Sequence, residues 1–72
     1  MTGRPYHQLA RQLRAAREAA RLSQEQAAER AAVSISAVSA SESGRVCPKL
    51  PLLCRLAGAY ETTASALLEG IR

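Results

Sequence analysis

Large aromatic side chains are almost absent from this 72-residue sequence, which contains no Trp, no Phe and only two Tyr. Apolar residues make up 47% of the chain, but 15 of them are alanine. A domain of this size buries only about 60% of its unfolded surface and is marginally stable by itself. We therefore expect one tightly packed domain over residues 1–72, joined by a partner subunit. A deep catalytic cleft is hard to build from so small a core, so we predict no enzymatic activity.

Long apolar runs and paired cysteines are also missing. No run approaches the roughly 20 residues that a membrane helix needs, and the basic N-terminal segment lacks the apolar core of a secretory signal. Two cysteines are too few for a disulfide scaffold, and residues that favour strands are scarce beside alanine. We expect a reduced, all-helical, cytoplasmic protein that does not contact membranes.

Positive charge is concentrated at one end of the chain. The formal net charge is +4, and nine of the ten basic residues are Arg. Residues 1–21 hold five Arg and one Glu (5 − 1 = +4), whereas residues 22–72 hold five bases and five acids. Arginine makes forked contacts with phosphate, and basic surfaces bind nucleic acid by releasing counterions. The distribution indicates a polyanionic partner, and on charge alone a solvated helix face is the competing explanation.

Local start and stop signals divide the chain into five helices. Pro5 suits a first helical turn, Ser23 with Gln26 forms a capping-box pattern, Ser34 is a natural N-cap, and Gly44 supplies a positive-φ stop. The predicted helices are Pro5 to about Ala20, Ser23 to about Arg30 or Ala31, Ser34 to near Ser43, about Leu50 or Pro51 to about Gly58, and Thr63 to Glu69.

The second and third helices, joined by a tight turn at residues 31–33, form a helix-turn-helix over about residues 23–43. The stretch LSQEQAAERAAVSISAVSASESGR (Leu22 to Arg45) resembles the lambda-repressor-like, or XRE/Cro-type, helix-turn-helix family. The preceding L-R-x-x-R and the following L-x-x-L-x-x-L-A-x-A-Y and T-x-x-x-L-L extend the resemblance over about residues 9–70. It implies an all-α, compact five-helix domain that binds double-stranded DNA as a transcriptional regulator, without a cofactor.

Matching the family's positions residue by residue implies a set of phosphate contacts. Gln24 matches a position whose amide holds a backbone phosphate and often braces the first recognition residue. Arg45 matches a loop base that reaches phosphate, and Arg14 lies where the first helix approaches the flanking backbone. The implied phosphate-binding residues are Arg14, Gln24, Ser43 and Arg45.

The resemblance also implies internal supports for the recognition helix. Arg17 and Glu42 match an ion pair between the first and third helices, which positions them more than it stabilises them. Val33 and Val38 match buried residues that lock the third helix to the second.

Three positions depart from the family's pattern. Ala32 replaces the usual turn glycine, at a cost of about 1 kcal/mol if it is left-handed. Ala27 and Ser41 replace large buried residues, which thins the core.

The base-facing positions of the third helix depart from the pattern as well. They carry none of the side chains that make bidentate contacts with guanine or adenine, and each lost pair removes about 1–3 kcal/mol of discrimination. We therefore expect affinity to come mainly from phosphate contacts, water bridges and DNA shape. The implied base-facing residues are Ser34, Ile35, Ser36, Ser39 and Ala40.

A homodimer is expected, because two weak half-sites and a small core both favour one. It would place two recognition helices about 34 Å apart on a pseudo-palindromic operator. The first guess for the two-fold contact is Tyr60, Ala64, Leu67, Leu68 and Ile71.

A second function stays open: the fold could serve as a protein-interaction module, antitoxin-like or sigma-factor-binding, with the Ser/Ala surface as a contact patch. Metal or redox chemistry is poorly supported, because His7, Cys47 and Cys54 lack paired ligand spacing. Cys54 falls on the apolar stripe of the fourth helix, so we expect it to be buried, whereas Cys47 is expected in an exposed loop. Without Asp, and with its only His far from the serines, the chain offers no hydrolase triad.

Overall fold

Five α-helices follow one another along residues 5–68, the part of the chain that the computed structural model describes, with side chains described from residue 7. This architecture confirms the predicted all-α, five-helix lambda-repressor-like fold. The helices are α1 (Pro5–Ala19), α2 (Gln24–Ala31), α3 (Ile35–Ser43), α4 (Leu50–Ala59) and α5 (Ala64–Leu68).

The predicted helix caps are present. The Ser23 hydroxyl accepts a hydrogen bond from the Gln26 N–H (3.0 Å), while the Ser23 N–H donates to the Gln26 side chain (2.8 Å), which completes a capping box. Ser34 accepts from the N–H of Ala37 at the start of α3 (3.1 Å). Thr63 caps α5 in the same way. These short-range bonds fix where α2, α3 and α5 begin.

Left-handed residues end the two helices of the helix-turn-helix. Ala32 ends α2 at φ 60° and ψ 44°, a conformation that costs a residue with a Cβ about 1 kcal/mol or more. Gly44 ends α3 at φ 81°, where glycine bears no such cost. Arg55 of α4 donates to the Ala32 carbonyl (3.5 Å) and thereby supports the turn.

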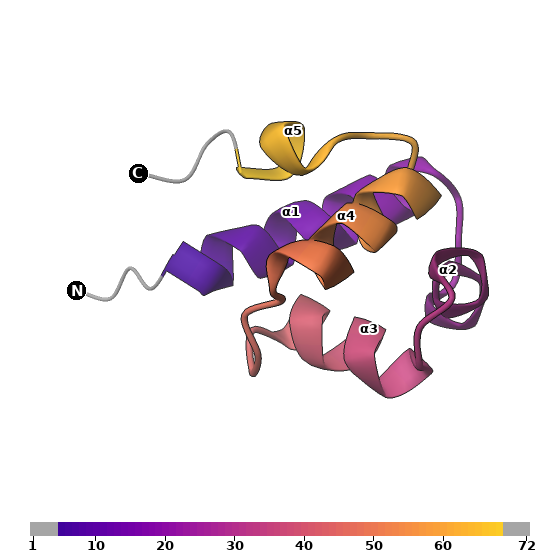
Figure 1. Cartoon of the computed structure of the whole chain (residues 1–72), viewed down its shortest axis with the longest axis horizontal. Helices are drawn as coiled ribbons and strands as arrows, with labels where there is room; N and C mark the ends of the chain where they lie inside the picture. Colours follow the sequence, from indigo (N-terminus) through magenta and orange to yellow (C-terminus); the bar gives the residue numbers. More distant parts are fainter. Residues whose placement is uncertain (1–4, 69–72) are drawn as a thin grey trace.

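α1 is the longest element and lies between α5 and α3 in the view of Figure 1. α3 packs against both α1 and α2, while α5 packs against α1 and α4. In Figure 1 α2 is seen almost end-on, whereas α3 lies across the view, so the two helices cross at a steep angle. This crossing leaves one side of α3 uncovered by the other elements.

The core is built from leucines and small residues. Leu13, Val38 and Leu56 are fully buried, and alanines of α2 and α4 fill the space between them. Val33 is only partly buried against this core. Ser41 is also fully buried, and its hydroxyl has no hydrogen-bond partner. A buried hydroxyl without a partner is a destabilising feature.

The burial of α4 and α5 corrects three expectations. Cys54 is exposed, because α4 turns Leu53, Leu56 and Ala57 inward and leaves Cys54 on the outer side. Tyr60 and Leu67 (4% and 3% exposed) lie in the chain's own core, so they are not available for a contact with a second copy.

The remaining residues of the predicted contact are on the surface or undescribed. Leu68 is exposed and Ala64 is half-buried, whereas Ile71 lies outside the described residues. Within residues 5–68 no helix is long and apolar enough to cross a membrane.

Candidate nucleic-acid interface

The uncovered side of α3 is neutral and made of small residues. Ser34, Ile35 and Ser36 are exposed at its start, and Ser39 and Ala40 are half-buried further along. Ile35 is the largest of these side chains, with 44% of its surface exposed. The Ser34 hydroxyl already accepts the bond that caps the helix. This face can therefore form close contacts with a flat surface but offers few groups that select a base.

The only charged residue of α3 points the other way. Glu42 is 4% exposed, and its carboxylate accepts bonds from three side chains: Arg17 (2.7 Å), Gln24 (3.2 Å) and Tyr60 (3.4 Å). We call these four residues the Glu42 cluster. It joins α1, the start of α2, the end of α3 and the end of α4. A carboxylate near a helix C-terminus is unfavourable, so the Arg17 charge compensates for its position.

Arg17 holds two parts of the fold together. Its Nε donates to Glu42, and its Nη1 donates to the Leu22 carbonyl (2.7 Å) in the connection between α1 and α2. The hydrogen bond to Glu42 raises the pKa of Arg17. The guanidinium is therefore charged and occupied, which makes Arg17 a structural residue.

Tyr60 closes the Glu42 cluster from the α4 side. Burial raises the pKa of Tyr60 to about 12, and the negative charge of Glu42 acts in the same direction. The phenol therefore stays protonated and donates to the Glu42 carboxylate. Nothing local in the sequence indicated this bond, because the two residues are 18 positions apart.

Three of the four residues expected to bind phosphate, Gln24, Ser43 and Arg45, lie at the end of α3. The Gln24 amide bonds to Glu42 and not to Ile35, the first residue of α3, whose side chain has no polar atom to accept it. Arg45 is exposed, and its Nε donates to the Ser43 hydroxyl (3.1 Å). Arg14 is exposed on α1, one turn before Arg17.

His7 is an unforeseen neighbour of this region. It lies against Gly44 at the end of α3: a Cβ placed on that glycine would come 3.5 Å from Cδ2 of the imidazole. His7 and Arg14 are two helical turns apart on α1 and therefore share a side of that helix. This side of α1 consequently faces the end of α3, where Ser43 and Arg45 lie.

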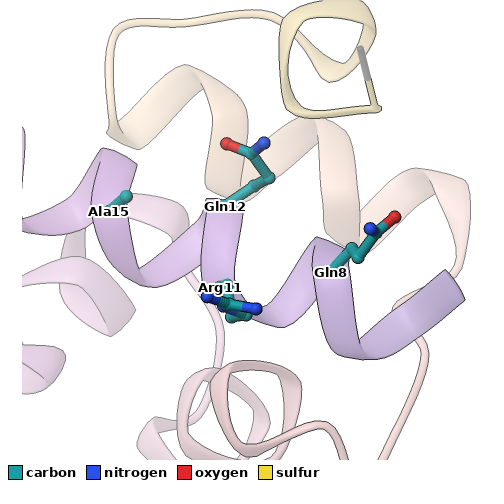
Figure 2. Close-up of a pocket in the computed structure, with 4 residues that line it drawn as sticks. All are labelled: Gln8, Arg11, Gln12 and Ala15. Atoms are coloured by element: carbon teal, nitrogen blue, oxygen red, sulfur yellow. The ribbon is translucent and has the colours of Figure 1, made fainter. Parts of the chain in front are cut away.

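One surface hollow is lined by Gln8, Arg11, Gln12 and Ala15, all of which project from α1 (Figure 2). Because its described lining comes from a single helix, this part of the hollow lacks the convergent polar groups of a ligand site. Among the described side chains, no three His, Cys or Glu residues are grouped closely enough to hold a metal ion.

Comparison with known families agrees with this architecture. A family model described as a helix-turn-helix domain matches residues 8–69, which are 62 of the 72 residues (69 − 8 + 1). A search of curated proteins gives no significant match. The matched region includes all of α2, α3, α4 and α5. The chain therefore belongs to the helix-turn-helix domain family, which typically consists of non-enzymatic DNA-binding modules.

Proposed function

We propose that this protein is a transcriptional regulator of the lambda-repressor-like (XRE) kind, which inserts α3 into the major groove of double-stranded DNA. The burial of Glu42 is the observation that carries the proposal. The only acid of α3 is withdrawn from the surface and paired with Arg17, so the outward face of the helix does not repel phosphate.

Phosphate contacts supply most of the affinity in this proposal. The proposed contacts are Arg14 on α1, Gln24 at the start of α2, and Ser43 and Arg45 at the end of α3. Arg45 uses only its Nε to bond Ser43, so the outer nitrogens of its guanidinium are left for a phosphate oxygen. Gln24 is the first residue of α2, at the positive end of that helix's dipole.

Base readout is correspondingly weak. Ser36 and Ser39 can each donate or accept one hydrogen bond, and Ile35 can pack against a thymine methyl group. Selectivity then depends on DNA shape and on pairing two half-sites. A homodimer would supply the pairing, with Leu68 and Ala64 as the described residues of the proposed contact.

The test is binding to duplex DNA as a function of salt, followed by fluorescence anisotropy. Binding is expected to weaken steeply with salt, and Arg14→Ala or Arg45→Ala is expected to reduce the slope by about one each. Arg30→Ala, which removes an exposed arginine at the other end of α2, serves as a matched control and leaves the slope unchanged. The absence of any binding at low salt would overturn the proposal.

One observation favours a second candidate function, a protein-interaction module. The exposed Ile35 and its small neighbours form a surface that also suits contact with another polypeptide. The salt titration separates the two functions. Failure to bind DNA at low salt leaves only the protein-binding function.

A further inference from the structure

We propose that Glu42 acts as a positioning residue that aims the side-chain amide of Gln24 at a DNA phosphate. This proposal rests on the DNA-binding function proposed above. Its basis is the bond from Gln24 Nε2 to Glu42 Oε1 (3.2 Å), which links the start of α2 to the last turn of α3.

The acceptor in this bond is held firmly. The other carboxylate oxygen of Glu42, Oε2, accepts from Arg17 Nε (2.7 Å) and from the Tyr60 hydroxyl (3.4 Å). Donors from α1 and from the end of α4 therefore fix the plane of the carboxylate, and Glu42 itself is 4% exposed. Oε1 is left facing Gln24 in one orientation.

Gln24 has a second donor to offer. Its amide carries two N–H groups, and Gln24 is only half-buried. While one N–H is bonded to Glu42, the other is held at a fixed place near the surface. A free glutamine would lose rotamer freedom on meeting a phosphate, whereas a side chain ordered in advance avoids most of this loss.

Glu42→Gln breaks this arrangement with little change of shape. A glutamine at this position has a single carbonyl oxygen. This oxygen accepts from Arg17, because a charged donor makes the stronger hydrogen bond. The remaining NH₂ group then faces the Gln24 amide and cannot accept from its N–H. Gln24 can then meet this group only with its own carbonyl oxygen, so the variant removes the bond that orients the Gln24 N–H groups while it keeps one bond to Arg17.

The test is a double-mutant cycle on DNA affinity at constant salt. We expect Gln24→Ala and Glu42→Gln each to weaken binding by about three- to tenfold, and the double variant to bind no more weakly than Gln24→Ala. Tyr60→Phe is the graded comparison: it removes the longer bond to Glu42 (3.4 Å) but leaves those from Arg17 and Gln24. It is expected to weaken binding clearly less than Glu42→Gln does.

A second measurement needs no variant at Glu42. The side-chain amide of Gln24 in the free protein should be as ordered by NMR relaxation as the backbone, unlike that of the exposed Gln12. Equal mobility of the two amides would overturn the proposal, as would independent losses in the cycle or a loss in Tyr60→Phe equal to that in Glu42→Gln. A wild-type chain that does not bind DNA would instead overturn the proposed function itself.

Discussion

The outward face of α3 and the buried side of its last turn are built from opposite kinds of residue. The face carries Ile35, Ser36 and Ser39, none of which is charged or hydrogen-bonded to another helix, whereas Glu42 bonds to three side chains from other elements. The difference separates two tasks. The buried side sets the position of the helix in the fold, and the exposed side contributes little beyond its shape.

The largest effect on stability is expected from removing the ion pair on the buried side of α3. Glu42→Ala removes the carboxylate and leaves the charge of Arg17 without its partner. We expect the free energy of unfolding to fall by about 3–5 kcal/mol, which is most of the stability of a small domain. Urea unfolding followed by helical circular dichroism measures the loss. Glu29→Ala, at an exposed position of α2, should change stability by less than about 0.5 kcal/mol.

The next effect is the response of the same cluster to high pH. The pKa of Tyr60 is about 12 in the folded chain and 10.0 ordinarily, so the folded state holds this proton more tightly. The stabilisation is complete below pH 10.0 and is lost as the pH rises towards 12. Unfolding measured across this range should show a fall in stability that Tyr60→Phe lacks. An equal fall in that variant would contradict the assignment.

Sequence patterns predict only some of the contacts on which these two predictions depend. The caps at Ser23 and Ser34 and the stop at Gly44 were predictable, because each depends on residues within one helical turn. Arg17 and Glu42, which the structure joins, could be paired only through the family resemblance. The Tyr60–Glu42 bond and the packing of His7 on Gly44 could not be anticipated, because tertiary packing alone brings them together.

The orientation of α4 and α5 shows the same limit. Cys54 and Leu53 are neighbours in the sequence. The apolar residues of α4 are so numerous that their pattern allows either residue to lie on the buried side of the helix. Packing against α2 and α5 selected Leu53 and turned Cys54 outward. Tyr60 and Leu67 were assigned to a contact with a second copy, although the small core needed them itself.

A smaller effect, of opposite sign, is expected inside the core. Ser41→Ala removes the buried hydroxyl that has no partner, so we expect the free energy of unfolding to rise by about 1 kcal/mol. Ser36→Ala, on the exposed side of α3, reports the change in helix propensity alone. The difference between the two variants isolates the buried hydroxyl. Equal gains in both would mean that the hydroxyl costs nothing.

The smallest effect is expected on the outward face. Ser36→Ala and Ser39→Ala should each change affinity for duplex DNA by about twofold or less, because a single hydroxyl discriminates bases poorly. Anisotropy titrations at constant salt give the comparison with Arg45→Ala. A loss as large as that of Arg45→Ala would show that the serines read bases after all.

The bonds and buried side chains that anchor α3 have a consequence for redesign. Val38 and Glu42 hold the helix from its buried side, so replacing Ser36 or Ser39 removes no anchoring contact. Combinatorial libraries could therefore vary these two positions without compensating mutations that restore the stability of the domain. The outward face of α3 can therefore be changed while the fold of the domain is kept.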